Sequence, residues 1–144
     1  MIRRGETYTL PRDMTKEAAL QFWFAGENEV FVCEEDTEDR PIVGTYFLRA
    51  NQRGGGSHVA NCGYVTAEKA EGRGIARGMC LHSLERAKQR GFHAMQFNFV
   101  VSTNERALRI WLSLGFEIVG RLPRAFDHPD VGFVDALILY RTLS

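Results

Sequence analysis

Short apolar runs separated by turns dominate the first half of the chain, a pattern typical of β-strands. Two runs rich in β-branched and aromatic residues, 30–33 and 42–48, flank an acidic stretch at 34–41. This arrangement predicts a β-hairpin with a solvated loop. A triple glycine at 54–56 marks a second loop, and the residues after it, 57–66, are expected to form another strand.

The N-terminal segment is expected to contain one strand and one helix. Residues 7–10 have strand character, and Pro11 ends the run because proline removes a backbone donor. Asp13 or Thr15 can then cap a helix whose apolar side chains, as far as Phe24, fall on one face.

Helical periodicity replaces the strand pattern in the second half. Ala76, Cys80, Leu84 and Ala87 recur at the spacing of a single helix face, which predicts an amphipathic helix over 74–90. A strand at 93–101, a helix at 104–114 and strands at 116–120 and 134–140 are expected to follow. No linker or repeat interrupts this order, so the sequence predicts one mixed α/β (α+β) domain over residues 1–144.

Composition restricts the classes of function. The chain has 144 residues, of which 44% are hydrophobic and 25% charged, enough for one globular domain with its own core. Its 18 basic residues equal its 18 acidic ones, so the basic excess that usually accompanies a nucleic-acid partner is missing. No apolar run approaches the roughly 18 residues of a membrane-spanning helix, and no signal-peptide core follows the N-terminus. We therefore expect a cytoplasmic protein that binds neither nucleic acid nor membrane.

The three cysteines give no sign of a metal site or a disulfide framework. Cys33, Cys62 and Cys80 are widely spaced, and no Cys-x-x-Cys pair is present. We expect the thiols to be reduced and mostly buried, and we expect no bound metal.

The balanced total charge hides an asymmetry between the two halves. Residues 1–72 carry 8 basic and 12 acidic side chains, whereas residues 73–144 carry 10 basic and 6 acidic ones. Net charge bears on association rather than on fold. A positive second half therefore raises the question of an anionic ligand.

The segment 71–79 is the strongest candidate for binding such a ligand. It is a glycine-rich turn between a predicted strand and the long helix, where unpaired backbone N–H groups at the positive helix end can bind phosphate. The candidate residues are Arg73, Gly74, Ile75, Ala76, Arg77 and Gly78. The alternative is a plain tight turn with solvated arginines. The spacing excludes the dinucleotide fingerprint, which needs glycine in place of Arg77, and the chain has no Walker loop.

Two motifs resemble the GNAT superfamily of acyl-CoA N-acyltransferases. Gly74 and Ala76 match the small positions of its pyrophosphate-binding motif, Gln/Arg-x-x-Gly-x-Gly/Ala, although Glu71 stands where Gln or Arg is usual. The segment 104–116 resembles the second signature of the superfamily, in which an Asn opens a helix that ends in Leu-Gly-Phe.

The resemblance implies a fold and a place for the donor substrate. A GNAT fold is a mixed, mostly antiparallel sheet flanked by helices, and it splays between strands four and five to admit acetyl-CoA. Pantetheine would pair with the free edge of strand four near 64–66, where a backbone N–H near Val65 would stabilise the oxyanion.

A narrower likeness concerns the acceptor. The segments 57–64 and 97–104 are similar to strands four and five of the yeast L-azetidine-2-carboxylate N-acetyltransferases. By that likeness Asn61 and Asn98 contact the substrate, and Asn104 contacts the cofactor.

Ordinary structural roles are also open to these asparagines. Asn98 interrupts an apolar strand, and its amide can satisfy a neighbouring backbone group instead of a substrate. Asn104 can cap the following helix, unless Ser102 caps it together with Glu105 and leaves Asn104 free for the ligand.

Direct acyl transfer needs a base for the amine, donors for the oxyanion and an acid for the sulfur. His58, on strand four, is the only histidine suitably placed to act as the base, and ordered water held by Asn61 and Asn98 is the alternative that we favour. The superfamily often has Tyr where Trp111 stands, and an indole cannot donate a proton at neutral pH. Tyr140 or water is the substitute, although a thiolate also leaves tolerably without an acid.

These features predict an N-acetyltransferase that moves acetyl from acetyl-CoA directly to the amine of a small molecule, an amino acid or a toxic analogue. Acetylation of a protein N-terminus or lysine is one alternative, for which the acidic loop at 34–39 is the feature to test. A non-catalytic acyl-CoA sensor is another, suggested by Glu71 and Trp111. Residues 121–126 form either part of the acceptor wall or a solvated loop. GNAT domains are often dimers, so a homodimer is open as well.

Overall fold

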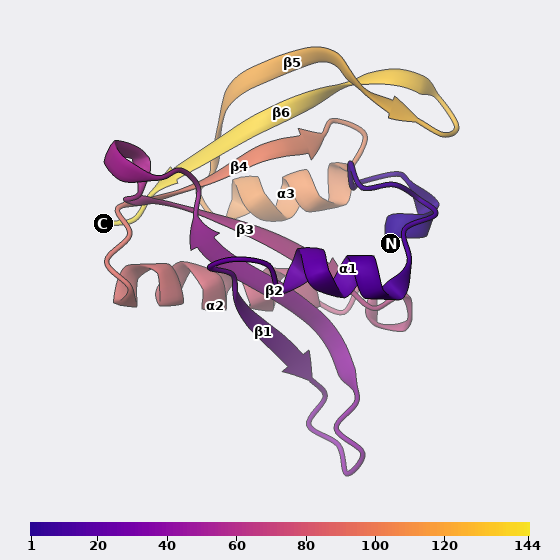
Figure 1. The fold of residues 1–144 in the computed structure, drawn as a ribbon, viewed down its shortest axis with the longest axis horizontal. Helices are drawn as coiled ribbons and strands as arrows, with labels where there is room; N and C mark the ends of the chain where they lie inside the picture. Colours follow the sequence, from indigo (N-terminus) through magenta and orange to yellow (C-terminus); the bar gives the residue numbers. More distant parts are fainter.

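A six-stranded sheet with the strand order β1-β2-β3-β4-β6-β5 forms the frame of the molecule (Figure 1). The computed structural model describes all 144 residues. The strands are β1 (Glu29–Glu34), β2 (Ile42–Ala50), β3 (Val59–Thr66), β4 (Ala94–Val101), β5 (Glu117–His128) and β6 (Gly132–Thr142). The helices are α1 (Lys16–Trp23), α2 (Ile75–Gln89) and α3 (Glu105–Ser113). Neighbouring strands are antiparallel, except that β3 and β4 are parallel.

β3 and β4 pair over only a short stretch. Val59–Ala60 is in register with Ala94–Met95, and the two strands make no further pairs with each other. The rest of each strand therefore diverges from the other and opens the middle of the sheet. The predicted mixed α/β fold with a sheet split between two strands is confirmed. β3 and β4 correspond to strands four and five of the GNAT resemblance. Their numbers are lower by one here because the strand expected at 7–10 does not form.

The N-terminal strap, residues 1–10, contains only a short 3-10 turn at Ile2–Arg4 and is otherwise irregular. The strand prediction for 7–10 is therefore wrong. Pro11 limits the run to a few residues, too short for a stable strand pair. A side chain makes the contact with β3 instead of a backbone ladder, since the Tyr8 hydroxyl donates a hydrogen bond to the Tyr64 carbonyl at 2.7 Å.

Helices cover both faces of the sheet. On β2, Tyr46 and Leu48 point into the main core with α2 and α3, whereas Thr45 and Phe47 point toward α1. Trp23 in α1 donates to the Thr45 hydroxyl at 3.1 Å and packs edge-on against the Phe47 ring. None of the helices has both the length and the apolar character that crossing a membrane requires.

Two helix predictions are confirmed in detail. Thr15, rather than Asp13, caps α1, because its side chain accepts a hydrogen bond from the Ala18 N–H at 3.1 Å. The expected apolar face of α2 is buried, with Cys80 and Ala87 fully shielded from solvent.

The C-terminal hairpin is longer than the sequence predicts. Residues 121–126, expected as a loop or an acceptor wall, belong to β5, and none of them lines the cavity described below. A register shift around Pro123 lets the strand continue past the proline. The Asp135 carboxylate occupies this bulge, where it accepts hydrogen bonds from the Arg124 N–H and the Arg121 guanidinium. These two bonds hold the pKa of Asp135 below its usual value.

Candidate functional site

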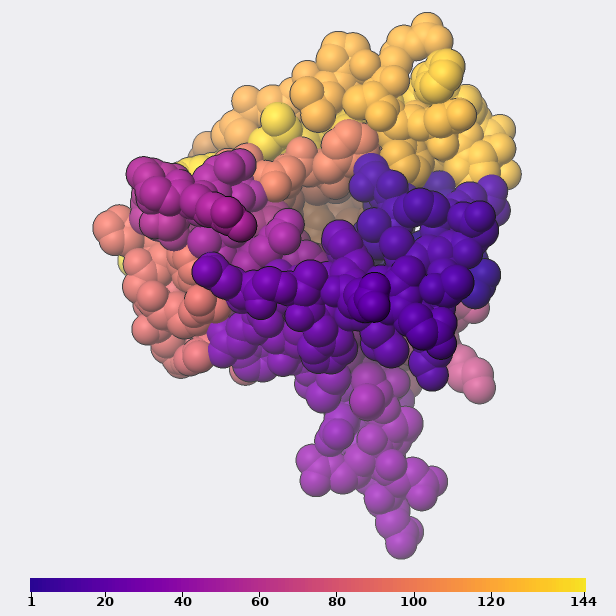
Figure 2. Space-filling model, viewed as in Figure 1, coloured from indigo at the N-terminus to yellow at the C-terminus, as the bar shows by residue number.

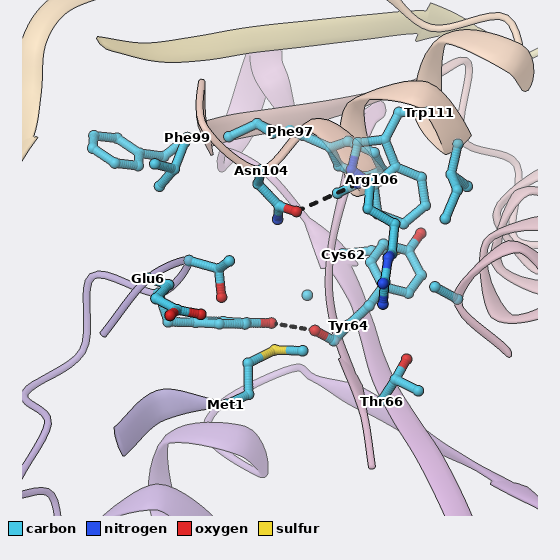
Figure 3. A pocket seen from close by; sticks show the side chains of 18 of the residues that line it. Met1, Glu6, Cys62, Tyr64, Thr66, Phe97, Phe99, Asn104, Arg106 and Trp111 are labelled. Carbon is cyan, nitrogen blue, oxygen red and sulfur yellow. Dashed lines mark hydrogen bonds between the residues drawn. The ribbon is translucent and has the colours of Figure 1, made fainter. Parts of the chain in front are cut away.

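A cavity of about 770 Å³ opens where β3 and β4 separate. Its walls come from the N-terminal strap, β2, β3, the start of α2, β4 and α3. Figure 2 shows a hollow between the indigo N-terminal region and the salmon β4–α3 region, and Figure 3 shows lining side chains from close by. The predicted site residues that line it are Asn61, Gly74, Ile75, Ala76, Arg77, Asn98 and Asn104. Those that do not are His58, Val65, Arg73 and Gly78.

The glycine-rich turn forms one end of the cavity. Gly74 is the N-cap of α2 with a φ of +82°, a left-handed conformation that favours glycine. A Cβ at Gly72 or Gly74 would meet no atom within 4 Å, so open space lies in front of the helix. The first helical backbone bond is donated by Gly78 to the Gly74 carbonyl, which leaves the N–H groups of residues 75–77 without a backbone partner. This geometry suits a pyrophosphate.

Arg73 and Gly78 take no part in this end of the cavity. Arg73 is salt-bridged to Glu35 in the β1–β2 loop, so its charge is already compensated. Gly78 lies one turn into α2 and is exposed to solvent. Arg77 does line the cavity, and its guanidinium is oriented by a 2.8 Å hydrogen bond to the Ser113 hydroxyl of α3.

Glu71, the residue that departs from the superfamily motif, is held between two arginines. Its carboxylate pairs with Arg4 at 2.7 Å and with Arg106 at 3.7 Å. All three side chains line the cavity (Figure 3 labels Arg106). Arg4 also lies 3.7 Å from Glu68 and 3.9 Å from Glu6, so its charge is shared among three carboxylates. The departure from the motif therefore places a paired carboxylate in this wall.

The free edge of β3 belongs to its even-numbered residues. Ala67 N–H bonds to β2, and the Val59 carbonyl accepts from Asn51, so odd-numbered backbone groups point toward β2. Tyr64 points the other way, because its carbonyl accepts from Tyr8 across the cleft. The expectation that the Val65 N–H faces the cleft is thus wrong. The backbone groups of Tyr64 and Thr66 do so instead.

Asn61 bridges the two strands at the point where they separate. It is buried, with 8% of its surface exposed, and its side-chain N–H donates to the Gln96 carbonyl of β4 at 2.9 Å. One half of the amide therefore satisfies a neighbouring backbone group. The amide oxygen has no hydrogen-bond donor within the protein and is available to a ligand.

Asn98 is exposed rather than buried. The sequence suggested that an amide buried among apolar strand residues would need a partner, and this reason does not apply to an exposed side chain. The exposure results from a register shift in β4 after Phe97, which turns Asn98 out of the regular ladder with β6. Its amide donates to the Asn51 side chain at 2.7 Å and accepts from Gln96 at 2.8 Å. It still lines the cavity.

Asn104 is the N-cap of α3, so the alternative cap at Ser102 is not used. The Asn104 side-chain oxygen accepts from the Ala107 N–H at 3.4 Å, as Figure 3 shows. The same residue lines the cavity, and its amide N–H group donates to no other part of the protein. Capping and ligand binding are therefore compatible.

Two residues considered for proton transfer lie elsewhere. His58 is exposed at the start of β3 beside His93, with the ring centroids 5.9 Å apart, and so lies outside the cavity. Tyr140 is in β6 opposite Gln96 and also lies outside it. Trp111 lines the cavity and packs against the Tyr64 ring at 5.1 Å.

Several polar side chains of the cavity were not predicted, among them Glu6, Tyr8 and Arg49. The strap brings in Glu6 and Tyr8, and no motif in residues 1–10 connects them with strands 50 residues away. Arg49 could have been identified from the sequence as a candidate site residue, because it is a cation at the end of an apolar strand run. Burial raises the pKa of Tyr8 above its ordinary value, so its hydroxyl stays protonated at neutral pH.

The cysteines and the other side chains that can bind metals are the last candidates for further chemistry. All three cysteines are free, and burial raises the pKa of Cys62 to about 12. No group of three or more His, Cys, Asp or Glu side chains is arranged to hold a metal ion.

Comparisons with known proteins agree with this geometry. Residues 3–116 match the model of the Acetyltransferase (GNAT) family. The N-acetyltransferase aca1 of Schizosaccharomyces pombe is 29% identical over 153 aligned residues, which cover 95% of this chain and 72% of that protein. A GCN5-related N-acetyltransferase from Kribbella flavida superposes with a TM-score of 0.92 at 35% identity, covering 99% of this chain and 85% of that one.

A more distant structure has the same fold. The phosphinothricin acetyltransferase of Sinorhizobium meliloti, solved in complex with AcCoA, has a TM-score of 0.75 at 18% identity, covering 89% of this chain and 69% of that one. The split sheet, the glycine-rich turn and the match over 3–116 lead to one conclusion. The chain belongs to the GNAT acetyltransferase family and is an acetyl-CoA-dependent N-acetyltransferase.

Proposed function

We propose that the enzyme transfers acetyl from acetyl-CoA directly to the amine of a small molecule, an amino acid or an amino-acid analogue. The position of the N-terminal strap carries this proposal. Tyr8 ties the strap to β3 at 2.7 Å and Arg4 ties it to Glu71 at 2.7 Å. Between them, Glu6 and Thr7 line the cavity. A chain segment across the opening suits a small acceptor better than an extended peptide, which needs an open groove.

The acidic loop gives little support to a peptide acceptor. No residue between 34 and 40 lines the cavity, and in Figure 1 the β1–β2 hairpin projects away from the splayed strands. Its Glu35 instead compensates Arg73. The similar structures include a phosphinothricin acetyltransferase and ribosomal-protein-alanine N-acetyltransferases, so these likenesses favour neither class of acceptor.

Direct transfer is supported by the state of the cavity's only cysteine. A thiol such as that of Cys62, with a pKa near 12, is protonated at neutral pH and is a poor nucleophile. The amine therefore attacks the thioester carbonyl itself, without an acyl-cysteine step.

We infer that Glu6 takes up the amine proton. Its carboxylate lines the cavity, as Figure 3 shows, and its one ionic contact is a loose one to Arg4 at 3.9 Å. Asn61 and Asn98 hold the acceptor and a relaying water, the role proposed for them from the sequence. The backbone N–H of Tyr64, on the free strand edge, stabilises the oxyanion.

Neither Trp111 nor Tyr8 protonates the leaving sulfur. The Tyr8 hydroxyl donates its one hydrogen to the Tyr64 carbonyl, and burial raises its pKa far above that of a thiol, so its part is to fix the strand edge along which the thioester must be held. The leaving thiolate, with an ordinary pKa of about 8.5, needs only modest assistance.

A panel of amino acids and analogues assayed with acetyl-CoA tests the proposed function. We expect release of free thiol with amino acids such as L-azetidine-2-carboxylate, and mass spectrometry should find the N-acetyl product. The G74E variant, which is expected to lose the donor substrate, is the matched blank. Acetylation of N-terminal peptides or lysine peptides in preference to every amino acid would overturn the proposal. Binding of acetyl-CoA without release of thiol with any acceptor would indicate a sensor rather than a transferase.

A further inference from the structure

Arg49 is a cation without a partner in the wall of the cavity. It is the only arginine of the chain that is not exposed and whose side chain neither pairs with a carboxylate nor donates a hydrogen bond. The other two partly buried arginines are both engaged, Arg86 with Glu29 and Arg141 with the Leu114 carbonyl. A buried, unpaired donor is destabilising unless a ligand satisfies it.

The buried donor is the Nε of Arg49, and it is not the only unsatisfied atom of this cavity. Three buried side-chain polar atoms of the protein lack a partner: Thr7 Oγ1, Asn28 Oδ1 and Arg49 Nε. Thr7 and Arg49 both line the cavity, and Asn28 does not. The unsatisfied polar atoms therefore gather where a polar ligand would bind.

The position of Arg49 separates it from the pyrophosphate end. Arg49 lies directly opposite Asn61 in the β2–β3 ladder, which places both side chains on one face of the sheet. Asn61 precedes Thr66, the last residue of β3 before the glycine-rich turn, by five positions, or about 17 Å along an extended strand. Arg49 therefore lies beside the proposed acceptor amides, too far away to bind the pyrophosphate.

Packing orients the guanidinium. It lies over the Phe47 ring, 5.4 Å from the ring centroid, and Phe47 is itself held by Trp23 of α1. The facing residue on β3 is Gly63, where a Cβ would lie only 2.6 Å from the Phe47 ring. The absence of a side chain at Gly63 thus lets Phe47 lie flat and support Arg49.

We propose that Arg49 binds the carboxylate of the acceptor, which makes the preferred substrates amino acids with a free α-carboxylate. The inference rests on the proposed function. A guanidinium matches the planar carboxylate with two parallel hydrogen bonds, whereas peptide N-termini, lysine side chains and simple amines have no carboxylate near the nucleophile. Without that anion the buried Nε–H of Arg49 stays unsatisfied, so the site selects against such acceptors.

Matched acids and amides test the proposal in turnover. L-proline and L-prolinamide differ only at the carboxyl group, and the amide has the more easily deprotonated amine. We expect wild type to prefer the acid in kcat/KM. Arg49→Met should lower kcat/KM for the acid roughly 10- to 100-fold, the loss typical of a charge-assisted hydrogen bond, and leave the amide nearly unchanged. Arg49→Lys should recover part of the loss. Arg53→Met, at an exposed arginine outside the cavity, is the control for charge.

Equal losses for acid and amide, or none for either, would overturn the role of Arg49. So would a wild-type enzyme that prefers amines without a carboxylate, an outcome that leaves the proposed function intact. If wild type acetylates no member of the panel, the proposed function fails, and binding alone decides the role of Arg49.

Binding can be measured without turnover by NMR, from the Nε–H resonance of Arg49 in the wild-type enzyme. This resonance is assigned by its absence from the spectrum of Arg49→Lys. Titration with L-proline in the presence of CoA should shift this resonance, and L-prolinamide should not. No shift with L-proline, L-alanine or L-azetidine-2-carboxylate would overturn the inference whatever the activity.

Discussion

The two ends of the cleft are built from different parts of the chain. The end that we propose binds pyrophosphate, called the pyrophosphate end, consists of backbone groups from one continuous segment, 72–77, at the start of α2. The acceptor end consists of side chains from the strap, β2, β3 and β4, with Glu6, Arg49, Asn61 and Asn98 among them. The first end depends on local conformation, whereas the second depends on how distant segments pack.

This difference has consequences for tolerance to substitution. At the pyrophosphate end most side chains can change as long as the space in front of Gly74 stays open, because the N–H groups belong to the backbone. At the acceptor end a single side chain carries each function, and no backbone group replaces it. We therefore expect substitutions at one end to affect the donor and at the other to affect the acceptor.

Gly74→Glu should have the largest effect. The new carboxylate occupies the space in front of α2 and repels the pyrophosphate, and the φ of +82° adds strain. We expect the dissociation constant for CoA to rise at least tenfold by calorimetry. Gly78→Glu adds the same charge outside the cavity and is the control. Unchanged affinity in G74E would eliminate the pyrophosphate assignment.

Asn98→Ala should act on the other end. We expect kcat/KM for an amino acid acceptor to fall about tenfold, since one positioning hydrogen bond is lost, while CoA affinity stays nearly constant. Asn51→Ala removes the 2.7 Å support of the Asn98 amide from outside the cavity and should cause a smaller fall. An equal loss of CoA binding and turnover, or no loss of either, would show that Asn98 is structural.

Tyr8→Phe tests the junction between the two ends. The variant loses the 2.7 Å bond to the Tyr64 carbonyl, and we expect kcat to fall by a few-fold because the strand edge that holds the thioester is positioned less firmly. Because burial raises the Tyr8 pKa, the wild-type enzyme should show no loss of activity from Tyr8 ionisation near pH 10, its unperturbed value. Tyr140→Phe, outside the cavity, should leave kcat unchanged. A full-activity Y8F enzyme would show that this hydrogen bond does not position the thioester.

Glu29→Gln should have the smallest effect and should spare both ends. A hydrogen bond from Arg86, together with the charges of Arg86 and Arg90, lowers the pKa of Glu29 in the folded protein. The interaction therefore stabilises the fold fully above the unfolded pKa of Glu, near 4.3. This stabilisation is lost as the pH falls through the lower pKa of the folded state. We expect Tm at pH 7 to drop by roughly 1–3 °C, with the difference from wild type disappearing in strong acid. A change in CoA affinity in E29Q would mean that the cleft is coupled to β1.

Local patterns predicted most of the framework. The caps, the apolar face of α2 and the β1–β2 hairpin are consequences of short-range sequence, and the structure has them where expected. Two predictions of strands were wrong. Residues 7–10 do not become a strand, and β5 continues past Pro123 because a bulge stabilised by Asp135 absorbs the interruption.

The site divides along the same line. Gly74 and Ala76 were identifiable because three consecutive N–H groups at a helix start need only local conformation. Val65 was misassigned because the direction of a strand's N–H depends on which neighbour it pairs with, and here odd-numbered residues pair with β2. His58 lies too near the paired start of β3 and β4 to reach the cavity.

The sequence by itself determined the order of most helices and strands and the glycine-rich turn, because helix starts, turns and strand periodicity are properties of contiguous residues. The split sheet was implied by the resemblance of two motifs to the GNAT superfamily. Only the tertiary structure decided the acceptor end. Glu6, Arg49 and Asn61 come together through strand register and the path of the strap. A side chain's role there depends on neighbours that are distant in sequence, and no local pattern specifies them.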